Sequence, residues 1–468
     1  MILPNSDDTI VAISTPPGYG GIGVIRLSGK RAFPIVSSLI DESIDLEKIE
    51  THTLHYCHIV GCARTLIDEV IVAIFKAPKS YTGEDVVEIS AHGNPHLLQQ
   101  IVKLAIAAGA RQAAPGEFTL RAFQSGRIDL VQAEAVADLI GAAGEAAEKS
   151  ALYQLSGGLS DYLDSLREEL VEIAALFEAY TDFPDEEIHP LQKEELAAKL
   201  NSVSTKLSRL AQSYGHGKII KTGVQIPIIG PPNAGKSSLF NAILAEERAI
   251  VTEIAGTTRD TIGESIELAG LPVRFIDTAG LGEPANLIEA KGIDRSQREI
   301  AGATLVIAVF DITQLCDLNQ SEAEDRVKDF VNRYGCEQPI LVLNKIDLVT
   351  AEKVERSAAR FAVYRGIFTS ATELAGIDQL LEEITGRIES NLPVGGDQNM
   401  LTSERHYQAA VSASQIVADV ESKLADNLSF EFLAFDLKEA IGYLEEILGR
   451  ISSEELLNEI FSRFCIGK

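Results

Sequence analysis

The chain has 468 residues, of which 46% are hydrophobic, so it can form roughly three domains with buried cores, and disorder is not the default. Its 41 basic and 69 acidic residues give a net charge of -28, which opposes general binding to nucleic acid, because phosphates favour clustered Lys and Arg. The sequence lacks a long apolar run and a signal-peptide pattern, and its five cysteines lack paired metal spacing, so we expect a cytoplasmic protein without a membrane segment.

The first region, residues 9 to about 118, alternates strand-like runs with Gly and Pro turns. Such runs lie at 9–13, 23–27 and 70–74, and one helix is predicted from about 95 to 108. This pattern predicts an α+β domain over residues 1–119.

A glycine-rich segment at residues 18–23 fits the spacing of a dinucleotide-binding loop. The residues that follow, Val24 to Leu27, predict a strand, whereas a dinucleotide loop must open a helix. We therefore reject a Rossmann site. Two interpretations stay open, a plain turn between strands and a loop that lets a ligand approach the backbone.

Apolar residues recur at helical spacing from about 120 to 212, with interruptions at 183–185 and at Pro190. Long helices are therefore predicted over residues 120–217.

Residues 230–237 form a phosphate-binding loop pattern. The pattern follows an apolar run at 224–229 and opens a helix at Lys236, which is the context that such a loop requires. We expect Lys236 to reach the β and γ phosphates of a nucleotide and the Ser237 hydroxyl to bind Mg²⁺. The predicted nucleotide contacts of this loop are Asn233, Ala234, Gly235, Lys236, Ser237 and Ser238.

Two further motifs follow in the order that a GTPase requires. Asp277 is placed to hold a water on Mg²⁺, with Gly280 near the γ phosphate, and the Asp347 carboxylate can accept two hydrogen bonds from guanine. A short loop at Ser370 fits closure over the base. The predicted contacts of these segments are Asp277, Thr278, Ala279, Gly280, Asn344, Lys345, Asp347, Ser370 and Ala371.

The position after Gly280 holds Leu281, where small GTPases carry a water-orienting glutamine. Glu289 is the candidate that replaces it. The alternative is that Glu289 belongs to a solvated switch loop and has no part in the reaction.

The helical pattern returns from about 403 to 463. We therefore predict a GTPase domain at 218–388 inserted into a helical domain that residues 120–217 and 389–468 build together. The fold class is α/β and α+β multidomain, with a Ras-like, mostly parallel sheet in the inserted part.

The whole chain from Thr9 to Lys468 resembles the MnmE (TrmE) family of bacterial tRNA-modification GTPases. The matching segments are residues 15–26, 81–88, 114–123, 126–135, 182–187, 256–260 and 464–468. The last segment is the most specific, because ribosome-assembly GTPases share the nucleotide motifs but not this tail.

The resemblance implies that the first domain forms a homodimer and holds 5-formyl- or methylene-tetrahydrofolate. The residues that match the family's folate contacts are Arg26, Glu88, Arg127 and Lys468. A guanidinium suits the glutamate tail of folate, and a carboxylate suits the donor edge of a pterin.

The resemblance also implies that K⁺ replaces an arginine finger at the nucleotide. The residues that match the K⁺ site are Asn233, Thr252, Ile254 and Thr257, and Thr258 matches a ligand of Mg²⁺. Further nucleotide contacts are implied at Glu253, Ala255 and Gly256, and Glu289 falls on the family's water-activating glutamate.

The family's reaction adds a carboxymethylaminomethyl or aminomethyl group to carbon 5 of the wobble uridine of certain tRNAs. The family's protein works in a heterotetramer or larger complex with the FAD-dependent protein MnmG. The resemblance also implies that Cys465 acts as a thiolate nucleophile or redox group. Two other functions stay open, a ribosome-assembly GTPase and a one-carbon folate transferase regulated by nucleotide.

Overall fold

The computed structural model describes residues 8–41, 44–61, 64–182, 190–246, 265–277, 303–335, 338–391, 399–426 and 428–468. The chain forms two compact units. One unit contains residues 1–137, 154–205 and 412–468, and the other contains residues 138–153 and 206–411. None of the helices in the described part has both the length and the hydropathy that a membrane span requires.

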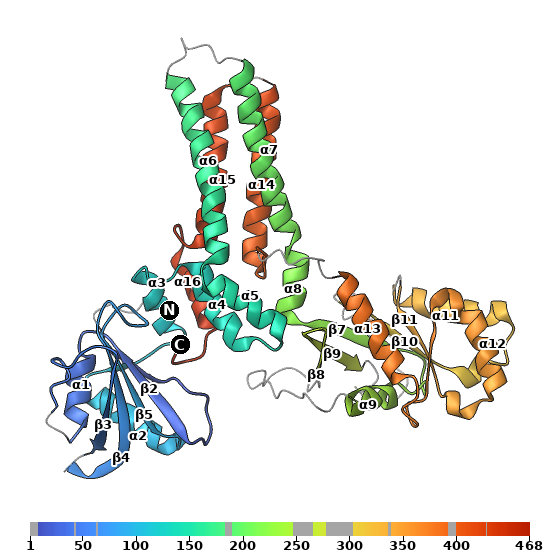
Figure 1. The fold of residues 1–468 in the computed structure, drawn as a ribbon, viewed down its shortest axis with the longest axis horizontal. Coiled ribbons are helices and arrows are strands. Elements are labelled where there is room, and N and C mark those ends of the chain that lie inside the picture. Colours follow the sequence, from blue (N-terminus) through green and yellow to red (C-terminus); the bar gives the residue numbers. More distant parts are fainter. Residues whose placement is uncertain are drawn as a thin grey trace. The chain divides into compact units, whose positions relative to one another are not determined.

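A six-stranded sheet dominates the start of the first unit (Figure 1). Its strands in spatial order are β3 (Thr53–Val60), β4 (Leu66–Phe75), β5 (Val86–His92), β2 (Ile22–Ser28), β1 (Ile10–Ile13) and β6 (Arg111–Gln112). Neighbours are antiparallel except β1 and β6, which are parallel. Helices α1 (Ala32–Leu39) and α2 (Pro95–Ala107) cover one face and bury an aliphatic core that includes Ile25, Ile89 and Ile101.

The glycine-rich segment before β2 is a turn and does not open a helix. The N–H of Gly20 donates to the carbonyl of Gly93 at 2.9 Å, and a Cβ on Gly93 would lie 2.5 Å from the carbonyl oxygen of Gly20. The strand β2 then begins at Ile22. The rejection of a dinucleotide loop is therefore confirmed.

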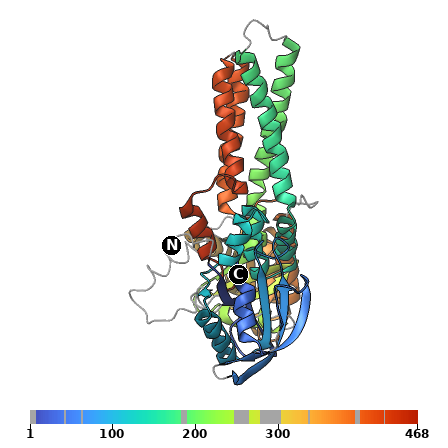
Figure 2. The same cartoon turned by 90° about the vertical axis from the view of Figure 1, so that its left-hand side faces the viewer.

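Long helices make up most of the rest of the first unit. Helices α6 (Gly158–Asp182) and α15 (Phe430–Leu448) lie side by side in both cartoon views (Figures 1 and 2). Their rings meet at Phe177 and Phe430, with centroids 5.4 Å apart, and Arg450 forms an ion pair with Asp164 at 2.7 Å. Buried leucines recur along α6 every three or four residues, which is the spacing of one helix face.

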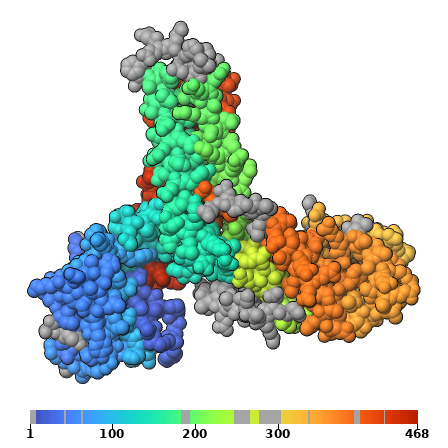
Figure 3. Space-filling model, in the orientation of Figure 1, coloured from blue at the N-terminus to red at the C-terminus, as the bar shows by residue number. Residues whose placement is uncertain are grey.

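Helices α7 (Pro190–Gln212) and α14 (Glu404–Ala425) extend this helical layer. The surfaces of α6 and α7 are neighbours on the face drawn in Figure 3. The Lys199 ammonium of α7 lies 3.8 Å from the Glu172 carboxylate of α6. Helix α7 starts at Pro190, which suits a first helical turn because the missing N–H has no partner there.

The last segment of the first unit packs on the domain that contains the first sheet. Helix α16 (Glu454–Ser462) packs on α3 (Glu117–Gln124) through Phe461, Phe464 and Leu120, and the chain then returns to the end of β1.

A second six-stranded sheet forms the centre of the other unit (Figure 1). Its strands in order are β12 (Ile367–Thr369), β11 (Ile340–Asn344), β10 (Ile307–Asp311), β7 (Val224–Ile229), β9 (Leu271–Asp277) and β8 (Ser265–Leu268). All pairs are parallel except β8 and β9. Parallel strands of this kind are apolar throughout because helices cover both faces.

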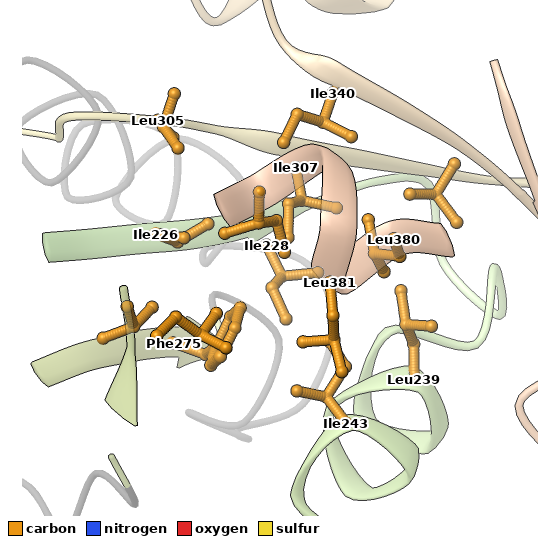
Figure 4. Packing of buried hydrophobic residues seen from close by; sticks show 14 of the residues in the cluster. Ile226, Ile228, Leu239, Ile243, Phe275, Leu305, Ile307, Ile340, Leu380 and Leu381 are labelled. Carbon is orange, nitrogen blue, oxygen red and sulfur yellow. The ribbon is translucent and has the colours of Figure 1, made fainter. Parts of the chain in front are cut away.

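Helices α9 (Lys236–Glu246) and α13 (Ile377–Asn391) cover one face of this sheet. Figure 4 shows Leu239 and Ile243 of α9 and Leu380 of α13 directed toward Ile226 and Ile228 of the central strand. Helices α11 (Gln320–Arg333) and α12 (Ala351–Phe361) pack on the other face.

The shorter helices are α4 (Leu130–Gly141), α5 (Glu145–Leu155) and α8 (Tyr214–Thr222), with 3₁₀ turns η2 (Ile312–Gln314), η3 (Ile346–Leu348) and η4 (Ala362–Tyr364). The predicted multidomain α/β and α+β fold class is confirmed. The predicted boundaries at 119, 217 and 388 stay predictions, because the two compact units divide the chain more coarsely.

Candidate functional site

The loop from Gly230 to Gly235 connects β7 to α9 at the carboxyl end of the central strand. Lys236 is buried, and its ammonium donates to the carbonyls of Gly230 at 2.9 Å and Pro231 at 3.1 Å. A Cβ on Gly230 would lie 2.2 Å from the carbonyl of Val309, so only glycine fits there. The loop thus has the tight backbone and the lysine that a phosphate cradle needs.

Asn344, the last residue of strand β11, holds this loop in place. Asn344 is only 1% exposed. Its amide donates to the carbonyl of Ala234 at 3.1 Å, and its carbonyl accepts from the Ala371 N–H at 3.2 Å. Gly235 has φ +92°, and a Cβ there would lie 2.3 Å from the Asn344 amide nitrogen. The structure therefore brings three predicted segments together at the carboxyl edge of the sheet.

Lys345 lies across the top of this loop. It has a left-handed φ of 70°, and its ammonium contacts the Asn233 carbonyl and the Asp311 carboxylate, each at 2.7 Å. Burial alone would raise the pKa of Asp311, but Lys345 and the Thr313 hydroxyl and N–H lower that pKa below its ordinary value. Sequence reasoning missed Asp311, although an acid that ends an apolar run, here β10, was a usable signal.

Asp347 is exposed, and a hydrogen bond within the protein orients its carboxylate. The buried Ser370 hydroxyl donates to its Oδ1 at 2.7 Å. A carboxylate fixed in this way at the rim of the phosphate loop can accept the two donors of guanine.

The described residues cover only part of the predicted metal sites. Ser237 and Ser238 lie exposed in the first turn of α9, and Asn233 is exposed on the loop with φ 63°. Asp277 is described only as the last backbone position of β9. The predicted residues outside the described part are Thr252, Glu253, Ile254, Ala255, Gly256, Thr257, Thr258, Thr278, Ala279, Gly280 and Glu289.

A second site lies on the open face of the first sheet, opposite α1 and α2. Arg26 of β2 and Glu88 of β5 are direct cross-strand neighbours, and the Arg26 Nε and Nη2 donate to one oxygen, Oε1, at 2.8 and 2.7 Å. The Arg26 guanidinium lies over the rings of Tyr81 and Phe118, with its Cζ 5.2 and 5.7 Å from their centroids. The two predicted contacts thus bind each other, which the sequence did not indicate.

The other predicted residues of this region lie near Tyr81 and Phe118. Arg127 and Tyr81 line one cavity of about 390 Å³. The carbonyl of Lys468 accepts from the Phe118 N–H at 3.2 Å, and the Gly467 carbonyl accepts from the Ser14 hydroxyl at 3.1 Å.

The tail before these residues is also attached to the sheet domain. Ile466 forms a β-bridge with Pro115, and Cys465 is an exposed free thiol. A Cβ on Gly467 would lie 2.2 Å from the Ile13 carbonyl, so the tail reaches this position only through glycine.

A phosphate loop after the central strand of a mostly parallel sheet, with Asn344, Lys345 and Asp347 at the same edge, defines a P-loop GTPase. A family model described as "GTP-binding protein TrmE N-terminus" matches residues 9–127, and one described as "MnmE helical domain" matches residues 130–465. The chain belongs to the MnmE family. It is therefore a GTPase that uses GTP with Mg²⁺.

Similarity to curated relatives extends over the full length. The tRNA modification GTPase MnmE of Flavobacterium johnsoniae is 40% identical over 467 residues, which covers 99% of this chain and all of that protein. The protein of the same name from Aquifex aeolicus is 40% identical over 462 residues, covering 98% of this chain and all of that protein. The solved G domain of the T. maritima FeoB iron transporter aligns with 35% of this chain and 98% of its own at 24% identity, with a TM-score of 0.25, too low to support a conclusion.

Proposed function

We propose that this chain hydrolyses GTP to drive the addition of a carboxymethylaminomethyl or aminomethyl group to carbon 5 of the wobble uridine of certain tRNAs. The observation that carries the proposal is the pair of contacts in which the Ser370 hydroxyl holds the Asp347 carboxylate and the Asp311 carboxylate holds the Lys345 ammonium. The full-length likeness to proteins named tRNA modification GTPase MnmE supports the choice of tRNA as the partner nucleic acid.

The phosphate loop supplies the electrostatics of hydrolysis. The Lys236 ammonium donates to the carbonyls of Gly230 and Pro231, and in the nucleotide complex phosphate oxygens would be its acceptors. Asn233 and Ser237 present exposed oxygens on the same loop, which suit K⁺ and Mg²⁺ respectively. When bound, these ions would neutralise the charge that develops on the phosphates. Glu289 would orient the attacking water, and dimerisation of the GTPase domains would complete the K⁺ site with Thr252, Ile254 and Thr257.

The first domain is proposed to hold 5-formyl- or methylene-tetrahydrofolate, which would supply the one-carbon unit. Its residues fit such a ligand, because Glu88 offers a carboxylate oxygen beside aromatic rings and Arg127 offers a cation at a cavity. The contact of Lys468 with Phe118 would keep the exposed Cys465 thiol close to this ligand.

The proposed assembly is a homodimer that joins the FAD-dependent MnmG, as the membership of the MnmE family implies. The overall charge of -28 favours a shared surface for tRNA, in which the partner provides most of the cations.

Nucleoside analysis of tRNA from a strain that lacks the gene tests the proposal. The wobble uridine should lose its 5-substituent, and a plasmid with the wild-type gene should restore it. Unchanged tRNA nucleosides together with a defect in ribosomal subunits would favour a ribosome-assembly GTPase. Unchanged tRNA with altered folate pools would favour a one-carbon transferase.

A further inference from the structure

The hairpin of β8 and β9 connects two segments of the chain that carry predicted contacts to the nucleotide (Figure 1). The predicted K⁺ and Mg²⁺ contacts at 252–258 precede β8, and β9 ends at Asp277, which the predicted contacts at 278–280 follow. Strand β9 pairs with β7, the strand that leads into the phosphate loop, and Ile228 lies opposite Asp277 in this register. The position of the hairpin against β7 therefore determines the place of Asp277 beside the phosphate loop.

The tip of this hairpin is held by the corner between α4 and α5. The N–H of Ala146, in the first turn of α5, donates to the Gly270 carbonyl at 3.2 Å. A first-turn N–H has no acceptor within its own helix, so the hairpin satisfies a donor that α5 leaves open. At Gly144 a Cβ would lie 2.9 Å from the same carbonyl oxygen and 3.0 Å from Pro272 Cδ, so the corner fits the hairpin only without a side chain there.

The end of α8 contacts the same hairpin. Gly223 has a φ of +76°, and a Cβ there would lie 2.4 Å from the Pro272 carbonyl oxygen. Lys221, two residues earlier, forms an ion pair with Asp138 of α4 at 2.7 Å. All of these residues belong to the compact unit that contains the GTPase sheet. The ends of α4 and α8 and the start of α5 therefore form one connected support for the hairpin tip.

We propose that the α4–α5 corner is a positioning element for the GTP-bound state, in which these contacts hold the hairpin so that Asp277 can keep a water on the Mg²⁺ of GTP. The inference rests on the Mg²⁺ role predicted for Asp277 and adds a contribution from residues that precede the predicted GTPase domain at 218–388. GDP should depend on this support much less. It lacks the γ phosphate, and its predicted contacts lie on the phosphate loop and at Asp347, which other hydrogen bonds hold.

Competition binding to the full-length protein, with GDP and the non-hydrolysable GTP analogue GMPPNP in the presence of Mg²⁺, tests this inference. Gly144→Val should weaken GMPPNP binding by about 10-fold and change GDP binding by less than about twofold, as expected when a packing clash falls on the GTP-bound state alone. The φ of Gly144 lies outside the left-handed region, so the added side chain acts through the hairpin and not through backbone strain. Gly141→Val is the matched control. A Cβ on this last residue of α4 meets no atom of the described residues within 4 Å, so both affinities should equal wild type.

A charge exchange at the ion pair gives a second test that does not depend on the glycine variant. Asp138→Lys and Lys221→Asp should each weaken GMPPNP binding about two- to threefold with GDP binding unchanged, and the double exchange should restore most of the loss, as expected for a partly exposed pair. Equal losses for both nucleotides in Gly144→Val, or unchanged GMPPNP binding in that variant and in both single exchanges, overturns the inference. Asp277→Asn separates the underlying prediction, because normal GMPPNP binding in this variant would refute the Mg²⁺ role of Asp277 itself.

Discussion

Replacement of Asp311 by alanine should weaken nucleotide binding, although Asp311 is not expected to contact the nucleotide. Its carboxylate lies 2.7 Å from the Lys345 ammonium and is 8% exposed, while the lysine side chain is 29% exposed. Exposed ion pairs contribute about 0.2–1 kcal/mol and buried charged hydrogen bonds about 1.5–3 kcal/mol, so a value of about 1.5 kcal/mol is expected here. This corresponds to about a tenfold higher Kd for GDP.

Equilibrium titration with a fluorescent GDP analogue measures this effect. Asp311→Asn keeps an acceptor for Lys345 and should give an intermediate Kd. Asp317→Ala is the control, because its pair with Lys353 has a similar distance of 2.6 Å but is 73% and 41% exposed. An unchanged Kd in Asp311→Ala, or an equal loss in Asp317→Ala, would refute the reasoning that the buried carboxylate orients Lys345.

Three further predictions concern ions, catalysis and pH. GTP hydrolysis should be much faster in K⁺ than in Na⁺ at matched ionic strength, and Asn233→Ala should remove this difference with nucleotide binding retained; equal wild-type rates would exclude the K⁺ mechanism. Glu289→Ala should lower kcat by roughly 100-fold with KM little changed, whereas a raised KM with normal kcat would mark a switch-loop residue only. Burial would raise the pKa of Glu117, but its bonds to Arg111 and Ala114 hold that pKa below the ordinary 4.5. Its carboxylate should therefore stabilise the fold above that pH and lose this effect as the pH falls, so the Tm of wild type should approach that of Glu117→Gln on acidification. A constant difference in Tm would contradict this assignment.

The nucleotide motifs were predictable because their spacing and order along the chain reflect contacts that the loop makes locally. The loop after β7 and the helix from Lys236 lie where the sequence placed them. The strand after the glycine turn and the helix α2 were predictable for the same reason, since alternation and helical spacing are local patterns.

Contacts between distant segments were not predictable in the same way. Arg26 and Glu88 are 62 residues apart, and only the strand register shows that they bind each other. Asp311 reaches Lys345 because β10 and β11 are parallel neighbours, and parallel register is not encoded in either strand alone. The cavity beside Tyr81 is lined by Arg127 from a separate segment, so the sequence alone had no signal for it.

An exchange of nucleotide specificity tests most directly whether turnover at this site drives tRNA modification. Asp347→Asn replaces the acceptor that faces guanine by an amide that can donate to the extra oxygen of xanthine. In a reconstituted reaction with MnmG and unmodified tRNA, the variant should modify the wobble uridine with XTP and fail with GTP, while the wild type should show the reverse. Modification by the variant that proceeds equally with GTP, or without any nucleotide, would contradict the account.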